Sequence, residues 1–379
     1  MEPRRYSGNS HWYHETQASA RAEQTPPLYP EAAEVEDRFL LGLQQNESIL
    51  TPLFQACRPL LCAGQALSLL LFPDSMTPTL THTLTLYDRL AIALTVAQVT
   101  GIQRLCNHYA ARLNPLPGPD SSRESNNRLT QLTQYARQLA GQPAVIDAAA
   151  LRRLDDVGLT TPDIVTLSQI VGFVSYQARI VAGLQALLGM PVCWLPGLNE
   201  CIDAPAHCFA LAGEYHFRLP PLERRYASEQ QLTAIAAAQA LPELADIVWL
   251  LAHDAPALHA WSHLQSLPPA AANAEESLAQ AVAARINGSP VCFRRYQGDF
   301  LLALQNGIDE ALAASRRQPL NHAVIQLAAQ LTRASDRLSA AHLQPLLTQG
   351  MTQHQLFNLI QRVALANWHN RLQQTLGEC

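Results

Sequence analysis

The chain has 379 residues, of which 48% are apolar and 15% are charged, so it is long enough to bury the cores of two ordinary domains. Its net charge of −5 and the lack of a dense basic stripe argue against a nucleic-acid surface. The sequence contains no lysine, which excludes a Schiff-base lysine, a P-loop lysine and a kinase-type strand lysine.

Neither a membrane span nor a signal peptide is expected. No apolar run reaches the roughly 18 residues of a span, and residues 1–23 are polar. Eight cysteines are scattered without a CxxC pair, which is typical of thiols in a reducing compartment. The spacings of Cys193, Cys201, His207 and Cys208 fit no common zinc site. We therefore expect a cytoplasmic protein with no metal, no other cofactor, and no nucleic-acid or membrane partner.

Residues 1–35 have the composition of an extended arm, which carries the aromatic cluster from His11 to His14. Beyond this arm, apolar residues recur with helical spacing, and the alternation typical of strands is nearly absent. The sequence therefore predicts an all-α fold. We expect helices over residues 34–46, 48–62, 85–99, 103–113, 127–140, 147–155, 161–187, 229–239, 242–251, 255–265, 275–286, 290–313, 321–332, 338–347 and 352–376.

Two parts of the chain match one another in the order of their features, which indicates an internal repeat. Placing residues 87–94 over residues 274–281 aligns Gly101 with Gly288 without a gap. The same register aligns Tyr109 with Tyr296.

The match continues with a second register. Residues 131–139 share their pattern with residues 323–331, and residues 158–164 share theirs with residues 350–356. Each copy then enters a long apolar helix with an aromatic residue and an arginine, which are Tyr176 with Arg179 and Trp368 with Arg371. We expect two copies of one helical domain, at residues 36–190 and 230–379, joined by a Pro- and Cys-rich connector at residues 191–229.

A helix start in the second copy carries a cysteine. Asn287-Gly288 predicts a turn, Ser289 is suited to cap a helix, and Pro290 is suited to its first position. Cys292 is then the third helical residue.

A thiol at such a position has two neighbours that favour its ionised form. The positive end of the helix dipole and the nearby Arg295 can lower its pKa below about 8.5. Tyr296 lies on the same helical face as Cys292. The alternative is that Cys292 is a small buried apolar residue, as most free cysteines are.

An Asn-Gly-x-Pro-x-Cys helix start, followed by a late helix with Asn-x-x-Asn-Arg, resembles the alkylhydroperoxidase D-like, or carboxymuconolactone decarboxylase, superfamily. The second copy carries these patterns at residues 286–292 and 367–372, and the first copy keeps parts of them at residues 159–169 and 173–179. The resemblance implies two tandem alkylhydroperoxidase D-like domains. It also implies that they pack as a pseudo-twofold pair and associate further into a homo-oligomer.

Peroxidase members of this family carry a Cys-x-x-Cys pair, a glutamate one helix earlier and a histidine four residues after the second cysteine. The second copy keeps only the second cysteine, as Cys292. Ser289 stands at the position of the first cysteine, Tyr296 at that of the histidine and Ser277 at that of the glutamate. Glu276 is one residue away from Ser277. The first copy holds Leu90, Ile102, Leu105 and Tyr109 at the four positions.

The resemblance therefore implies an oxidoreductase of peroxidase type that uses the single thiolate of Cys292. The substrate would be a small molecule such as a hydroperoxide, and an external thiol would reduce the sulfenic acid. Ser289 and Tyr296 would donate hydrogen bonds to the leaving oxygen, and Glu276 would carry protons. The alternatives are a lyase of the carboxymuconolactone kind and a non-catalytic small-molecule binding protein.

Polar residues interrupt the last apolar helix at Asn367, His369, Asn370 and Arg371. Polar side chains among apolar ones need partners. Two interpretations are open for these four side chains: a structural hydrogen-bond network, or the wall of a substrate pocket beside Cys292.

Overall fold

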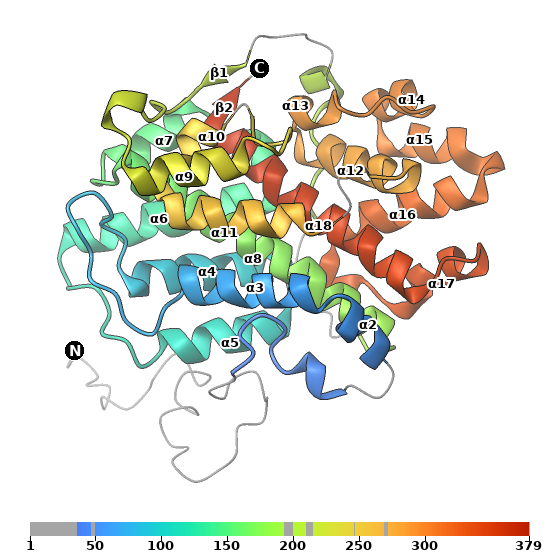
Figure 1. Cartoon of the computed structure of the whole chain (residues 1–379), viewed down its shortest axis with the longest axis horizontal. Coiled ribbons are helices and arrows are strands. Elements are labelled where there is room, and N and C mark those ends of the chain that lie inside the picture. The colour runs from blue at the N-terminus through green and yellow to red at the C-terminus, as the bar shows by residue number, and fades with distance from the viewer. Residues whose placement is uncertain are drawn as a thin grey trace, which may run out of the picture.

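The computed structural model describes residues 36–46, 50–192, 200–209, 215–245, 247–268 and 272–378. Helices make up most of this part of the chain (Figure 1), which confirms the predicted all-α class. Its two short strands, β1 (His216–Phe217) and β2 (Gly377–Glu378), pair antiparallel. The aromatic cluster of the arm and Cys193 lie outside the described residues.

The first part of the chain forms seven α-helices between residues 50 and 190. Their bounds are α2 (Thr51–Ala56), α3 (Arg58–Leu71), α4 (Leu86–Thr100), α5 (Gln103–Leu113), α6 (Arg123–Gly141), α7 (Ala148–Asp155) and α8 (Thr161–Leu187). Short 3₁₀ turns lie at Leu43–Asn46 and at Pro143–Val145, the latter between α6 and α7.

The later part begins with turns at Ala206–Phe209 and Arg224–Tyr226 and continues as helices. Their bounds are α9 (Glu229–Ala238), α10 (Val248–Leu251), α11 (Ala255–Ser266), α12 (Ala274–Asn287), α13 (Pro290–Phe293), α14 (Leu301–Asn306), α15 (Ile308–Ala314), α16 (Pro319–Arg333), α17 (Ala340–Thr348) and α18 (Gln353–Leu376). Further 3₁₀ turns lie at Ala252–Asp254, Ser315–Arg317 and Ser335–Arg337.

The prediction of one long helix over residues 290–313 was wrong, because the structure divides this stretch into α13, α14 and α15. Glycine destabilises a helix interior, and the breaks contain Gly298 and Gly307. A side chain at 298 has no room, because its Cβ would lie 2.2 Å from the hydroxyl oxygen of Tyr296. The break therefore lets Tyr296 fold back over the backbone that follows it.

Capping boxes begin α4 and α8. The hydroxyl of Thr85 accepts from the backbone N–H of Asp88, whose carboxylate accepts from the backbone of Thr85. Thr160 and Asp163 repeat this arrangement at the start of α8. Such reciprocal bonds satisfy backbone donors that a helix start leaves open.

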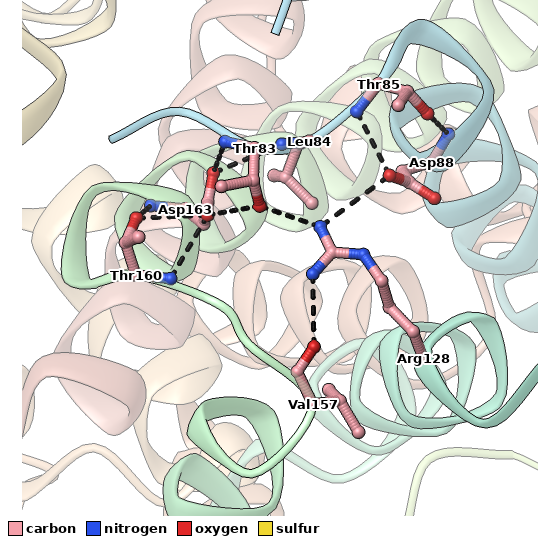
Figure 2. Close-up of polar contacts among 8 residues, drawn as sticks. All are labelled: Thr83, Leu84, Thr85, Asp88, Arg128, Val157, Thr160 and Asp163. Carbon is pink, nitrogen blue, oxygen red and sulfur yellow. Dashed lines mark hydrogen bonds and ion pairs between the residues drawn. The ribbon is translucent and has the colours of Figure 1, made fainter. Parts of the chain in front are cut away.

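The carboxylate of Asp163 also joins the two helix starts (Figure 2). It accepts hydrogen bonds from the backbone and hydroxyl of Thr83, both at 2.7 Å, and from the backbone of Leu84 at 3.2 Å. Arg128 of α6 donates to the Thr83 hydroxyl at 2.9 Å and lies 3.8 Å from the carboxylate of Asp88. A buried carboxylate therefore fixes where α4, α6 and α8 meet.

Helices α8 and α18 pack against each other through the middle of the molecule (Figure 1). Glycine allows their close approach, since a Cβ on Gly172 would lie 1.9 Å from the indole of Trp368. A Cβ on Gly183 would lie 2.6 Å from Ile360. Helix α8 is long and apolar enough to cross a membrane, but its most apolar window is entirely buried inside the protein.

The order of local features is the same in both parts of the chain. Gly101 and Gly288, with φ of 71° and 75°, end α4 and α12 in the left-handed conformation that glycine adopts without strain. Gly158 and Gly350, with φ of 81° and 88°, precede α8 and α18. Each of these two helices then begins with a capping box.

Hydrogen bonds cross between the two parts at positions that the sequence match pairs. Arg179 of α8 donates to the carbonyl of Thr332 at 2.9 Å, and Arg371 of α18 donates to the carbonyl of Ala140 at 2.6 Å. These are reciprocal contacts, because the match pairs Arg179 with Arg371 and Ala140 with Thr332.

A second pair of contacts is reciprocal in the same way. The hydroxyl of Tyr176 donates to the side chain of Gln361 at 2.9 Å, and the indole of Trp368 donates to Gln169 at 3.0 Å. All four side chains are buried. The buried apolar side chains of both parts also form one continuous cluster.

Candidate functional site

A cavity of about 220 Å³ borders Cys292. Helix α12, the segment that includes α13, and α18 supply most of its wall, and residues before α12 supply its rim. Its lining consists of Glu243, Gln265, Ala272, Ser277, Gln280, Ala281, Cys292, Arg295, Tyr296, Leu365, Ala366, His369 and Asn370. The cavity therefore brings together three of the seven predicted site residues, namely Cys292, Tyr296 and His369.

Cys292 is half-buried, so it is neither sealed in the core nor fully exposed. Helix α13 is a single turn of four residues, which makes the helix dipole a smaller influence on the thiol than a long helix would give. The cationic neighbour remains, because Arg295 lines the same cavity. Its guanidinium lies 3.4 Å from the carbonyl oxygens of Pro242 and Glu243.

Ser289 does not fill its expected roles. Its side chain makes no capping hydrogen bond to α13, and it is fully buried outside the cavity lining. Its hydroxyl oxygen has no hydrogen-bond partner among the described residues. The N-cap pattern alone therefore did not determine the orientation of this side chain.

Tyr296 contributes to the cavity wall, but its hydroxyl oxygen lies over the backbone at Gly298. Burial raises the pKa of the phenol, and a hydrogen bond with the backbone of Phe300 opposes that shift. The expected hydrogen bond to a leaving oxygen would require this hydroxyl to turn away from its backbone partner.

Glu276 lies apart from Cys292. Its carboxylate accepts a hydrogen bond from Arg362 at 3.1 Å, and it borders a different cavity, of about 460 Å³. The next residue, Ser277, lines the Cys292 cavity instead. Successive helical residues are about 100° apart, so only one of the two faces the thiol.

His369 is 6% exposed and lines the cavity. Its ring stacks on Trp261 with centroids 5.9 Å apart. Burial, with a smaller contribution from Arg295, lowers the pKa of His369 to about 3. The imidazole is therefore neutral at physiological pH, and its Nδ1 has no hydrogen-bond partner among the described residues.

Asn370 is fully buried and also lines the cavity. Neither its amide nitrogen nor its amide oxygen has a partner in the described part of the protein. Leaving a buried polar atom unsatisfied costs about 1–3 kcal/mol. The amide is thus available to a ligand that offers both a donor and an acceptor.

Asn367 and Arg371 lie on the opposite side of α18 and do not line this cavity. The oxygen of Asn367 accepts from Asn287 at 3.0 Å and from Arg371 at 3.0 Å, and its nitrogen donates to Thr332 at 3.1 Å. Of the two interpretations left open for these residues, the structural network describes their contacts.

Sequence reasoning did not consider Gln280. It named Ser277 only as the residue at the glutamate position, Arg295 only as a cation near the thiol, and Asn370 only as one member of a polar run. A usable pattern was present in α18, because residues 365, 366, 369 and 370 follow the three- and four-residue spacing of one helical face. Applying that spacing to the polar run would have separated 369 and 370 from 367 and 371.

In the first part of the chain, the positions that match this site hold buried side chains. Leu90 and Leu105, at the positions of Ser277 and Cys292, are buried. The hydroxyl of Tyr109 donates to Gln177 at 2.6 Å. The amide nitrogen of Gln177 donates in turn to the carbonyls of Arg38 and Phe39, at 2.9 and 2.8 Å.

Comparisons with protein-family models, curated proteins and solved structures found no match to the chain. The chemistry of the site therefore rests on its own residues. Within the described ranges, no three side chains of His, Cys, Asp or Glu gather as a metal site would need. What the cavity offers is a thiol, a guanidinium, a neutral imidazole and an unpartnered amide.

Proposed function

We propose that the protein reduces a small organic hydroperoxide with the thiolate of Cys292. The observation that carries the proposal is the position of this sulfur beside a cavity that Arg295 and Asn370 also line. A cation next to a thiol favours the thiolate, which is the nucleophilic form. The unpartnered amide of Asn370 can hold the peroxide without giving up a protein contact.

In the first step the sulfur attacks one peroxide oxygen, the O–O bond breaks and an S–O bond forms. The leaving alkoxide takes up the proton that the thiol released, so the products are an alcohol and a sulfenic acid. The amide N–H of Asn370 and the charge of Arg295 stabilise the developing negative charge. His369 is not the acid in this scheme, because a pKa of about 3 keeps it neutral.

The sulfenic acid then reacts with an external thiol, which releases water and leaves a mixed disulfide. A second external thiol attacks this disulfide, restores Cys292 and leaves as the disulfide of the reductant. The cycle uses no second protein cysteine. Asn370 and Arg295 take the roles expected of Ser289 and Glu276, whose side chains lie outside the cavity.

Replacing the nucleophile tests the proposal. We expect Cys292→Ser to lower peroxide turnover at least about 100-fold, measured with an alkyl hydroperoxide and dithiothreitol. A dimedone adduct should form on Cys292 of the wild-type protein. The matched control is Cys106→Ser, because Cys106 is half-buried and burial raises its pKa to about 11. Unchanged turnover in the Cys292 variant would contradict the proposal.

A non-catalytic binding protein is the second candidate, and the open amide of Asn370 favours it. On this reading a small ligand with both a donor and an acceptor binds whether or not Cys292 is present. Saturable binding that survives Cys292→Ser but not Asn370→Leu, without turnover, would identify it. A lyase would need an acid–base pair at the cavity, whose titratable groups beside the thiol include His369 and Glu243.

We also propose that residues 36–190 and 230–379 are copies of one alkylhydroperoxidase D-like unit, paired about a pseudo-twofold axis. The support is the reciprocity of the Arg179 and Arg371 contacts and of the Tyr176 and Trp368 contacts. A twofold relation requires that if one residue contacts a second, their counterparts do the same. Association into a homo-oligomer and a cytoplasmic location remain predictions.

A further inference from the structure

Two arginines lie deep between the two parts of the chain. Arg179 of α8 is 3% exposed and Arg371 of α18 is 1% exposed. Burial lowers the pKa of each guanidinium, and that of Arg179 is lowered further by the charge of Arg371. The two like charges are therefore close enough to repel one another.

Neither arginine has a carboxylate partner in the described part of the protein. The hydrogen bonds of Arg179 go to the carbonyls of Ser175 and Thr332. Those of Arg371 go to Asn367 and to the carbonyl of Ala140. The Nε atom of each guanidinium is buried without any partner. Burying a charge without a counter-charge is costly.

Two other arginines of this region are neutralised. Arg333 holds the carboxylate of Asp203 through two bonds, at 2.7 and 2.5 Å. Arg337 pairs with Glu200. Arg179 and Arg371 are therefore the buried arginines of this region whose charge no carboxylate compensates.

A cavity of about 480 Å³ opens beside this pair. Arg179 lines it, together with Ala140 and Thr332, whose carbonyls accept the two reciprocal bonds. Cys201 also lines it, and the charges of both arginines act on its thiol. Arg137 adds an exposed guanidinium to the lining, and Asp336 adds a carboxylate whose pKa burial raises.

We propose that this cavity binds a small organic molecule through an oxyanion, a carboxylate or a phosphate, which compensates the buried charge of Arg179. The apolar lining, which includes Val99 and Ala334, holds the rest of such a molecule. The site is separate from the Cys292 cavity, since the two share no lining residue. The proposal stands or falls independently of peroxide chemistry.

Thermal unfolding of the full chain tests the proposal in a buffer without oxyanions. We expect inorganic phosphate or succinate to raise the midpoint by about 3 °C or more, relative to sodium chloride at equal ionic strength. The comparison of the two anions identifies the source of the charge. Arg179→Met keeps the length of the side chain but removes its charge. The anion concentration needed for the same rise in midpoint should increase at least about tenfold in this variant.

Arg137→Met is the matched control, because it removes an exposed guanidinium from the same lining, and it should keep most of the effect. A midpoint that rises equally in wild type and Arg179→Met would overturn the proposal. So would the absence of any rise beyond that with chloride.

A second measurement needs no variant. Alkylation of Cys201 by iodoacetamide, followed by mass spectrometry, should slow when either anion occupies the cavity. The exposed Cys62 serves as the internal reference. Unchanged alkylation of Cys201 at saturating phosphate and succinate would overturn the proposal even if the arginine variant failed to fold.

Discussion

Asn370 and Arg371 are neighbours in α18, yet they have opposite surroundings. Asn370 lines the Cys292 cavity with both amide atoms unpartnered. Arg371 donates to the carbonyl of Ala140 across the boundary between the two parts. Because helical residues are about 100° apart, one polar run serves both a cavity and a structural network. A residue's place on its helix face decides its role here more than its chemical type.

His369 shows how such burial affects stability. An exposed histidine has a pKa near 6.5, and that of His369 is about 3 in the folded protein. Between these values the unfolded chain binds a proton that the folded chain does not, so stability falls as pH falls below about 6.5. For this residue alone we expect the free energy of unfolding to be about 2 kcal/mol lower at pH 5 than at pH 7.5.

Urea unfolding of wild type and His369→Gln at both pH values checks this expectation. The variant should lose about 2 kcal/mol less than wild type on acidification. His263→Gln, on an exposed histidine of α11, is the control for removing an imidazole elsewhere. If wild type and His369→Gln have parallel pH profiles, His369 is protonated as easily in the folded protein as in the unfolded chain.

At the scale of helices, Asp163 and Gln355 hold the same capping position but differ in the contacts that their side chains make. Gln355 is exposed and closes only its own capping box in α18. Asp163 is buried and accepts five hydrogen bonds, two of them from Thr160 and three from residues 83 and 84. Removing its carboxylate leaves several buried donors without an acceptor.

We therefore expect Asp163→Ala to lower the free energy of unfolding by about 3 kcal/mol or more. Gln355→Ala should cost about 1 kcal/mol, the usual size of a cap. Chemical denaturation of the two variants measures both values. Equal losses would mean that the contacts of Asp163 with the start of α4 add nothing to its capping bonds.

Helices with local end signals were the ones that the sequence predicted well. The expected helix at 161–187 matches α8, whose capping threonine and Asp163 are readable in the sequence. The stretch 290–313 was mispredicted, because its apolar spacing suits a helix while Gly298 and Gly307 lie in the breaks between α13, α14 and α15.

The candidate site was predicted in part for the same reason. Cys292 was found because a turn and a proline mark its position locally. Arg295 follows the cysteine by three residues, so its proximity was also readable locally. Asn370 comes from α18, and only packing brings it to the thiol. The expected roles of Ser289 and Glu276 depended on side-chain directions that residue spacing alone does not determine.

For the whole molecule, the two parts of the chain do not have separate cores. The apolar cluster runs through both, and even the connector is attached, since the backbone of Cys201 donates to Arg333 and that of Ala204 to Ile286. With α8 and α18 packed together in the centre, neither part can lose its packing without exposing the other. We infer that the described protein unfolds as one unit.

Leu132 of α6 tests this inference, because it is fully buried in the first part and far in sequence from the second. Leu132→Ala should lower the free energy of unfolding by about 2–5 kcal/mol. If unfolding is cooperative, the amides of α16 in the second part lose as much hydrogen-exchange protection as those of α6. Exchange measured peptide by peptide gives both losses. Loss confined to α6 and its neighbours would mean that the two parts open separately, and that the contacts between α8 and α18 do not couple them.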